Sequence, residues 1–418
     1  MSLSSWVPVA HGSPFPVENL PYGVFSHGEE DPRVCVAIGR YVLDLAPLAA
    51  SEGADFASVF QEPTLNPFMA LGRRAWRAVR HWLTERLTDE SHRPLVEPEL
   101  VPRDQVRLHM PFTVADFVDF YASEHHATRL GQILRPGEPP LNPNWKHLPV
   151  GYHGRAGTVV VSGTPVRRPS GQFRPADAAA PEFGPTSRLD IEAEVGFVIG
   201  TPTEPGSQVS VDDVRDHVFG VVLVNDWSAR DLQAWEARPL GPFLGKSFLT
   251  SISPWVVPLD ALEPAMFTPP TQVPEPLAYL RGTHDFGLDL ELTVSLNGTV
   301  LSRPRYADMY WTPGQKLAHL TANGAALRTG DLFASGTVSG PREDTCGSLI
   351  ELTDGGTRPV TLADGSQRTF LLDGDTVTIE ATAPAGETQR LGFGEVTGTV
   401  CPATAPAYRV SPPGGAQT

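Results

Sequence analysis

The chain has 418 residues, 40% of them hydrophobic, and a formal net charge of −16. That length favours one large domain together with a smaller one, and the composition is typical of a folded globular protein. Nucleic acids and anionic membrane surfaces repel a strongly acidic chain, so we expect neither as a partner.

The three cysteines, Cys35, Cys346 and Cys401, lie far apart in the sequence and form no CxxC pair. This spacing predicts neither a disulfide framework nor a thiolate zinc site, and it fits a reducing, cytoplasmic compartment. The amino-terminal stretch has no basic start followed by an apolar segment, so it does not predict a signal peptide. No run of about 18 apolar residues predicts a membrane span.

The first part of the chain is predicted to form a small domain, 1–111, with the second domain at 112–418. It begins with two short strands, 33–39 and 41–48, joined by a Gly-Arg turn. A helix is predicted over 71–87, where apolar residues recur at helical spacing. A proline-rich and extended stretch then leads to the boundary.

Short strands dominate the prediction for the second part of the chain. Turn signals, among them Asn297-Gly298, Asp364-Gly365 and Asp373-Gly374, separate them. Many short strands at fairly regular spacing predict a mainly β fold, as a sandwich, roll or barrel. The predicted strands cover 158–166, 189–200, 218–226, 247–258, 288–296, 331–340, 357–362, 369–381 and 395–400, and helices are predicted within 113–134, 226–236 and 309–324.

The glycine-rich stretches do not predict nucleotide binding or serine hydrolysis. GPFLGKS, at 241–247, has three residues between its glycines where a phosphate loop has four. GFGEVTG, at 392–398, has the wrong spacing for a dinucleotide-binding turn. SGTVSG, at 335–340, does not match the GxSxG turn that carries a nucleophilic serine.

Acidic residues give a stronger signal. Glu192 and Glu194 lie two positions apart on a predicted strand, so their carboxylates should emerge on one face, roughly 6–7 Å apart. Such a pair more commonly marks a solvated face, but a divalent cation would also remove the repulsion. Asp119, among aromatic residues, and Asp226, predicted to open a helix, would complete an oxygen-only site suited to Mg²⁺ or Ca²⁺. Asp226 would alternatively be a simple helix cap.

Four further residues have two interpretations each. His126 follows Asp119 by seven residues, so on a helix both would project to one side, and a histidine serves as a general base or as a capping residue. Arg230 and Gln233 share a face of the predicted 226–236 helix, where Arg230 would also form an intrahelical pair with Asp226. Lys246, among apolar residues, either extends its amine to solvent or binds carboxylates.

Several long stretches together resemble the fumarylacetoacetate hydrolase family, from about residue 6 to about residue 400. They include DFYASEHHATRLG (119–131), LDIEAEVGFVIG (189–200), VNDWSARDLQAWEARPLGPFLGKSFL (224–249) and GDLFASGTVSG (330–340). The resemblance implies a small N-terminal SH3-like barrel, a large C-terminal β-roll and a homodimer. It also implies hydrolysis of 4-fumarylacetoacetate to fumarate and acetoacetate, a step of tyrosine and phenylalanine breakdown.

The resemblance also implies roles for individual residues. One Mg²⁺ or Ca²⁺ per subunit would be bound by Asp119, Glu192, Glu194 and Asp226, with Lys246 and Thr250 beside it. His126 would be the catalytic base and Glu351 its carboxylate partner, while Arg230, Gln233 and Lys246 would stabilise an oxyanion. Substrate contacts would come from Tyr121, Arg135, Tyr152 and Thr337.

Two positions depart from the family pattern. Ala237 stands where a substrate-contacting tyrosine is usual, so that contact is lost or is supplied by a neighbour such as Arg238. Leu249 stands where a glycine is usual. The alternatives within the superfamily are an acylpyruvate hydrolase and an oxaloacetate decarboxylase, and a metal-stabilised binding module without turnover is the alternative from another class.

Overall fold

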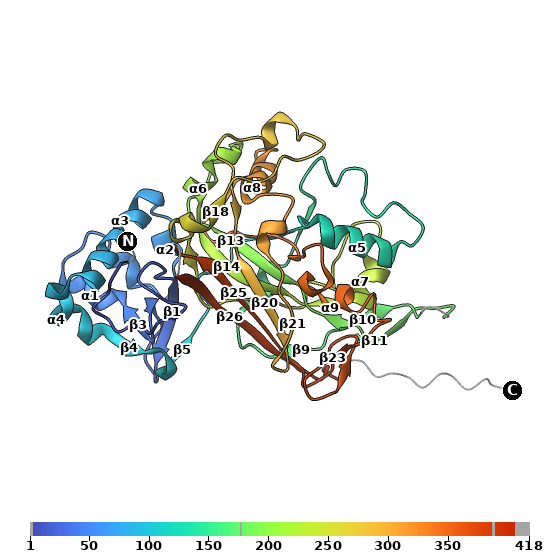
Figure 1. Cartoon of the computed structure of the whole chain (residues 1–418), viewed down its shortest axis with the longest axis horizontal. Coiled ribbons are helices and arrows are strands. Elements are labelled where there is room, and N and C mark those ends of the chain that lie inside the picture. Colours follow the sequence, from blue (N-terminus) through green and yellow to red (C-terminus); the bar gives the residue numbers. More distant parts are fainter. Residues whose placement is uncertain (1–2, 176–177, 387–388, 406–418) are drawn as a thin grey trace.

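The computed structural model describes residues 3–175, 178–386 and 389–405. It consists of a small N-terminal part and a larger C-terminal part, and Figure 1 shows the two side by side. Antiparallel and mixed sheets form the framework of both parts. The predicted mainly β architecture is therefore confirmed.

The N-terminal part is built on one antiparallel sheet of five strands, in the order β4-β3-β2-β1-β5. The sequence prediction of a second strand over 41–48 was too long. Asp44 accepts a hydrogen bond from the backbone N–H of Ala46 and caps a helix there, so the strand ends. The strands are β1 (Tyr22–His27), β2 (Arg33–Ile38), β3 (Tyr41–Asp44), β4 (Leu100–Pro102) and β5 (Val106–Leu108).

Helices cover this small sheet. The predicted helix over 71–87 is confirmed as α3 (Arg73–Thr88), whose apolar stripe of Trp76, Val79, Leu83 and Leu87 is buried. Because these positions recur every three or four residues, they form one face that packs on the domain core. The other helices here are α1 (Leu45–Ser51), α2 (Asn66–Met69) and α4 (Arg93–Val96).

The C-terminal part contains an eight-stranded sheet at its centre, in the order β7-β6-β22-β13-β14-β16-β8 with β17 also paired to β14. Its inner strands are buried on both faces and are rich in valine, which is typical of a covered sheet. The strands are β6 (Phe117–Phe120), β7 (Gly151–His153), β8 (Val159–Val161), β13 (Ala193–Ile199), β14 (Val218–Asp226), β16 (Thr250–Ile252), β17 (Val257–Pro258) and β22 (Leu332–Ala334).

A second sheet, ordered β21-β20-β25-β26-β9, packs on the first and shares one hydrophobic core with it. Its long strands β25 and β26 cross the molecule in Figure 1. The predicted turn at Asn297-Gly298 is confirmed between β20 and β21, with both residues at positive φ as a tight hairpin requires. The strands are β9 (Val166–Arg167), β20 (Glu291–Leu296), β21 (Thr299–Ser302), β25 (Thr376–Pro384) and β26 (Arg390–Cys401).

The remaining elements connect and cover these sheets. Paired short strands are β10 (Ser170–Phe173) with β11 (Glu182–Pro185), β12 (Leu189–Asp190) with β15 (Ser228–Ala229), β18 (Met266–Phe267) with β19 (Gly287–Leu288), and β23 (Val360–Thr361) with β24 (Gln367–Arg368). The helices are α5 (Glu124–Leu134), α6 (Val214–His217), α7 (Arg230–Glu236), α8 (Pro313–Thr321) and α9 (Leu349–Leu352).

Several predicted strands of the C-terminal part were wrong in their limits: 247–258 contains two separate strands, β16 and β17, 331–340 is a strand only in β22, and the strand expected over 369–381 begins at Thr376. Two predicted helical stretches were also wrong in their limits. The stretch 113–134 contains strand β6 before helix α5, and the helix expected over 226–236 begins only at Arg230. Asp226 therefore ends strand β14 and caps no helix. In each case, pairing with a strand remote in sequence outweighs the local helical pattern.

The three cysteines are free, as the sequence predicted. Within the described ranges, none of the helices combines the length and the apolar character that crossing a bilayer requires.

Lys316, on α8, is a fully buried lysine in the larger core. Its Nζ donates a hydrogen bond to the Tyr306 hydroxyl at 2.9 Å and lies 5.0 Å from the centre of the Phe197 ring. Burial lowers the pKa of Lys316 to about 7, although Glu194 and Asp119 act in the opposite direction. At neutral to mildly alkaline pH, the Lys316 amine is therefore protonated in the unfolded chain but only partly protonated in the folded chain.

We predict that Lys316→Met changes the pH dependence of stability. As pH falls from 10 to 7, the unfolded lysine is protonated and the buried one resists protonation, so the wild type loses stability relative to the variant. The expected slope is on the order of 1 kcal/mol per pH unit. Urea unfolding of both proteins at pH 7, 8 and 9 measures it. Lys146→Met, at a partly exposed lysine, is the matched control substitution. A pH-independent difference at Lys316 would contradict the assignment.

Candidate active site and metal centre

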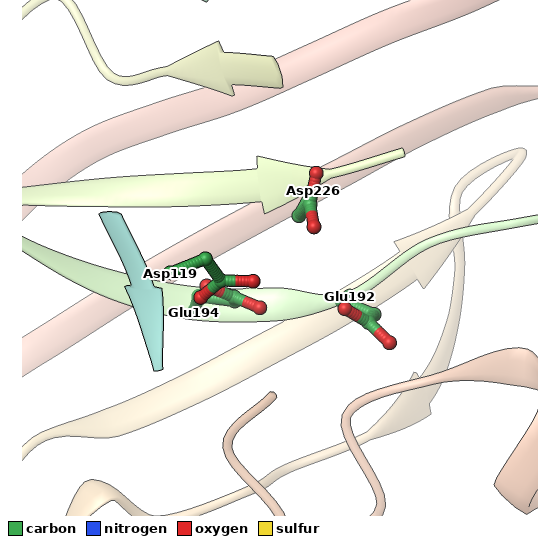
Figure 2. A group of neighbouring side chains, drawn as sticks. All are labelled: Asp119, Glu192, Glu194 and Asp226. Carbon is green, nitrogen blue, oxygen red and sulfur yellow. The ribbon is translucent and has the colours of Figure 1, made fainter. Parts of the chain in front are cut away.

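Four acidic side chains converge in the middle of the C-terminal part. Asp119, Glu192, Glu194 and Asp226 are all buried, and each offers one carboxylate oxygen within 4.8 Å of those of the others. Figure 2 shows Asp226 at the end of one strand, Glu194 on the strand beside it, Glu192 where the chain enters that second strand, and Asp119 on a third strand. The structure therefore brings together residues that span more than a hundred positions of sequence.

The strand register explains this convergence. Asp119 lies on β6, opposite Ala334 of the parallel strand β22, and β22 in turn pairs with β13, which carries Glu194. Asp226 ends β14, and its backbone N–H donates to the Glu192 carbonyl at 3.1 Å. Glu192 lies one residue before β13, yet the alternation along the chain still directs both glutamates to one side.

The electrostatics of this group favour a bound cation. Neither carboxylate oxygen of Glu194 has a hydrogen-bond partner within the described chain. Burial and then the nearby charges of Asp119 and Asp226 raise the pKa of Glu194 well above its usual value. Burial and the charge of Asp226 also raise the pKa of Asp119, to about 8. An all-carboxylate set with unpartnered buried oxygens fits a hard divalent ion such as Mg²⁺ or Ca²⁺.

Lys246 and Thr250 lie against the same carboxylates. The Lys246 amine donates to Glu192 and, at 2.7 Å, to Asp226, while the Thr250 hydroxyl donates to Asp226 at 3.2 Å. The Tyr152 hydroxyl also donates to Asp226, at 3.0 Å. Burial alone would raise the pKa of Glu192, but the charges of Lys246 and of a neighbouring arginine hold it well below its usual value. Glu192 is therefore the member of the set that is ionised most readily.

Arg230 is the neighbouring arginine, and the simpler of its two interpretations, an intrahelical pair with Asp226, is wrong. Because α7 begins at Arg230 itself, the guanidinium points to other partners: Nε donates to Asp190 at 2.8 Å and Nη2 lies 2.8 Å from a Glu192 oxygen. Its Nη1 donates to the side-chain oxygen of Gln233 at 3.1 Å. Gln233 is thus oriented with its oxygen toward Arg230 and its amide NH₂ available to another acceptor.

His126 and Glu351 form a buried pair. The two are 225 residues apart in sequence, and His126 Nδ1 lies 2.7 Å from Glu351 Oε2. That oxygen also accepts hydrogen bonds from the Ser339 and Ser348 hydroxyls, at 2.9 and 2.7 Å. Burial would raise the pKa of Glu351, but His126 and the two serines lower it, so the carboxylate is ionised.

An ionised Glu351 can only accept a hydrogen bond, so Nδ1 of the neutral His126 ring carries the proton and donates it in that bond. Nε2 is then the unprotonated nitrogen. Nε2 lies 3.8 Å from Glu192 Oε1 and thus faces the acidic group. The expectation that Asp119 and His126 share a helix face is wrong. Asp119 lies on strand β6 and His126 on helix α5, and the turn between them brings the two side chains to the same place.

A cavity of about 890 Å³ opens beside these groups. The expected substrate residues Tyr121, Arg135, Tyr152 and Thr337 all line it, as do the basic and amide groups Arg230, Gln233 and Lys246. Of the four acidic residues, Asp119 and Glu192 line the cavity and Glu194 and Asp226 do not. The cavity lining also does not include Thr250, His126 and Glu351. Ala237 and Arg238 also line this cavity, so the position that departs from the family pattern faces the same space.

Sequence reasoning missed three residues that hold the site in place. Asp190 accepts from Arg230 and from the backbone N–H groups of Leu349 and Ile350, at 2.8 and 3.1 Å, and so links the Arg230 helix to the Glu351 helix. Asp190, Glu192 and Glu194 alternate along LDIEAE, and this pattern was the available signal. Ser339 and Ser348 gave no comparable signal, because single serines occur in many loops.

Two family models match the chain. Residues 18–111 match the one described as fumarylacetoacetase N-terminal, and residues 116–401 match the one described as fumarylacetoacetate (FAA) hydrolase C-terminal. Among curated relatives, the fumarylacetoacetase of Homo sapiens is 46% identical over 419 residues, which cover 96% of this chain and 100% of the human protein. That of Arabidopsis thaliana is 44% identical over 421 residues, covering 96% and 99%.

Solved structures show a similar fold. The fumarylacetoacetate hydrolase from psychrophilic Exiguobacterium antarcticum matches with a TM-score of 0.55 and 18% identity, covering 92% of this chain and 99% of that one. A maleylpyruvate hydrolase from Sphingobium matches with a TM-score of 0.52 and 17% identity, covering 92% and 100%.

We predict that Glu194→Gln weakens divalent-cation binding, because one of four carboxylates is lost. Excess Mg²⁺ or Ca²⁺ should stabilise the wild type by about 2.7 kcal/mol at a hundred times the dissociation constant, and should stabilise the variant much less. Thermal unfolding with chelator and with excess cation, together with calorimetric titration, measures this difference.

Without a cation, Glu194→Gln should be no less stable than the wild type, because the variant lacks a buried carboxylate that has no partner. Glu380→Gln removes an exposed carboxylate of strand β25 and is the control. Equal cation affinity in wild type and Glu194→Gln would remove Glu194 from the ligand set.

Proposed function

The chain belongs to the fumarylacetoacetase family, and we propose that it hydrolyses 4-fumarylacetoacetate to fumarate and acetoacetate. The observation that carries the proposal is the convergence of four carboxylates beside the His126–Glu351 pair, next to a cavity lined with basic groups. Near full-length similarity to curated fumarylacetoacetases supports the substrate. We assign Asp119, Glu192, Glu194 and Asp226 as ligands of one divalent cation, Mg²⁺ or Ca²⁺.

The first step is removal of a proton from water by His126. Glu351 holds the ring with Nδ1 protonated, so Nε2 has the free lone pair that accepts this proton, and the same carboxylate then stabilises the imidazolium. The water oxygen adds to the carbonyl carbon of the fumaryl part. A divalent cation in the carboxylate site supplies Lewis-acid polarisation of a substrate carbonyl.

The addition creates a negatively charged oxygen, and we assign its stabilisation to three side chains. Arg230, Gln233 and Lys246 all line the cavity. The hydrogen bond from Arg230 to the Gln233 oxygen leaves the Gln233 amide hydrogens free to donate to the substrate. Loss of one such donor commonly slows turnover by about 10²–10³-fold.

The bond between the carbonyl carbon and the adjacent acetoacetyl carbon then breaks. As the oxyanion re-forms a carbonyl, the electron pair of the broken bond stays on the departing carbon, which takes up a proton to give acetoacetate. The carbonyl carbon becomes the new carboxylate of fumarate and loses the second proton of the water to solvent. Through solvent, the proton held by His126 then replaces the one given to the departing carbon. Lys246 is positioned to donate the proton that the departing carbon takes up, because its buried ammonium lies at the cavity wall. Burial lowers its pKa, but Asp226 and Glu192 raise it above its usual range, so the amine stays charged before transfer.

The remaining cavity residues are assigned to substrate binding. Arg135 donates to the Asn142 side chain and, at 2.8 Å, to the Pro140 carbonyl, which fixes its guanidinium beside a site for a substrate carboxylate. The buried Thr337 hydroxyl has no partner within the described chain and is free to bond to substrate. Tyr121 packs against His126 with ring centres 5.4 Å apart, and Tyr152 binds Asp226.

We also propose a homodimer and a cytoplasmic location. Three free cysteines are consistent with a reducing compartment. Leu240 and Phe243, 95% and 65% exposed near the cavity, offer apolar surface that a second subunit would cover. The domain boundary is proposed at 111/112, between β5 and β6.

The purified chain should consume 4-fumarylacetoacetate, followed as loss of ultraviolet absorbance, and release fumarate and acetoacetate in equal amounts. A chelator should abolish turnover, and Mg²⁺ or Ca²⁺ should restore it. An acylpyruvate and oxaloacetate serve as competing substrates in the same assay. Faster turnover of either one, measured as kcat/KM, would replace the proposed substrate.

His126→Ala should reduce kcat by at least about 10³-fold, because water then lacks its base. His125→Ala, at the adjacent and less buried histidine, should keep nearly full activity. Calorimetric titration should give unchanged cation affinity in both variants. Near-normal kcat in the His126 variant would assign the base to another group.

A further inference from the structure

A second cavity lies close to the site, on the far side of Glu351. It has a volume of about 250 Å³, and Glu351, Arg129 and Arg358 are among the residues that line it. It shares only Glu351 with the catalytic pair and no residue with the substrate cavity. The carboxylate group of Glu351, which binds His126, therefore also borders a cavity that has no part in the mechanism above.

The two oxygens of Glu351 are held very differently. Oε2 takes three hydrogen bonds, from His126, Ser339 and Ser348, at 2.7, 2.9 and 2.7 Å. Oε1 has one partner among the described residues, Nη1 of Arg129, at 3.4 Å. Arg129 is thus the single group that fixes the second oxygen of this carboxylate.

Arg129 is itself held firmly. Its Nη1 also donates to the Gly340 carbonyl at 2.9 Å, and its Nη2 donates to the Pro341 carbonyl at 2.8 Å. These carbonyls directly follow Ser339, which donates to Glu351. Arg129 also lies three residues after His126 on helix α5, so one guanidinium connects the helix of the base, the loop of a supporting serine, and the carboxylate partner.

We propose that Arg129 is a positioning residue for hydrolysis and acts through Glu351; the proposal rests on the function assigned above. A carboxylate can turn about its terminal bond, and a turn of Glu351 would weaken its bond to Nδ1. Arg129 opposes that turn by binding Oε1, so the imidazole keeps the orientation in which Nε2 faces the acidic group. For metal-ligating histidines, loss of a group that orients the ring commonly costs about 10–100-fold in activity or affinity, and we expect the lower end of that range for His126.

The test compares two arginines of the same cavity. Arg129→Gln should lower kcat about tenfold and leave KM within twofold, because Arg129 is not among the residues that line the substrate cavity. Arg358→Gln removes the other guanidinium, which pairs with Glu343 at 3.1 Å, and should leave kcat unchanged. Among the described residues, the ion pairs of Glu351 are with His126 and Arg129. A lower Tm of Arg129→Gln with unchanged kcat would reduce Arg129 to a structural clamp and overturn the proposal.

A double-mutant cycle locates the effect. Glu351→Gln and the double variant Arg129→Gln/Glu351→Gln are measured at high enzyme concentration, and removal of Arg129 should have no further effect once the carboxylate is absent. The same tenfold loss in both backgrounds would overturn the proposal. Arg129→Lys, which keeps the positive charge, serves if Arg129→Gln does not fold. It should retain more than about one tenth of the wild-type kcat, and a full tenfold loss counts against the proposal.

The proposed function fails separately from this proposal. If the wild type leaves fumarylacetoacetate intact, the proposed substrate is wrong. The role of Arg129 is decided separately, by the ratios of kcat among the variants, measured with whichever diketo acid the enzyme hydrolyses.

Discussion

The site depends on an excess of buried negative charge. Asp119, Glu192, Glu194 and Asp226 would carry four charges if ionised, while Lys246 and Arg230 supply two positive charges, and Arg230 is shared with Asp190. Burying unpaired carboxylates is strongly unfavourable, so the protein either protonates some of them or binds a cation. The raised pKa values of Glu194 and Asp119 show the first response, and a divalent ion provides the second.

The fold accommodates this excess of negative charge because the backbone N–H and C=O groups of the surrounding sheet are hydrogen-bonded between strands. Strands β13 and β14 lie in the interior of the eight-stranded sheet, with their backbone groups paired on both edges. Their apolar side chains pack into two hydrophobic clusters, so the strands hold position although the acidic side chains repel each other. Rigid strands also keep the carboxylate oxygens close together, which a flexible loop would not achieve against repulsion.

The His126–Glu351 pair is supported in the same way, by contacts from several parts of the chain. Glu351 lies on the four-residue helix α9, whose backbone N–H groups bind Asp190, and Asp190 in turn binds Arg230. His126 is in the first turn of α5, where its backbone N–H donates to the Ser123 cap. His126 and Glu351 are thus connected through Asp190 and Arg230 to Glu192 of the acidic group, so the position of one depends on the others.

The sequence by itself determined those features that depend on neighbouring residues. The alternation of Glu192 and Glu194 put both on one side, the spacing of Trp76 and Leu83 produced a helix, and Asn297-Gly298 produced a tight hairpin. Only the tertiary structure decided which remote groups meet. Asp226 ended a strand instead of opening a helix, and Arg230 turned to Asp190 and Glu192. The reason is physical: local pattern reports backbone preference and burial, whereas strand pairing and ion pairing depend on residues tens to hundreds of positions away.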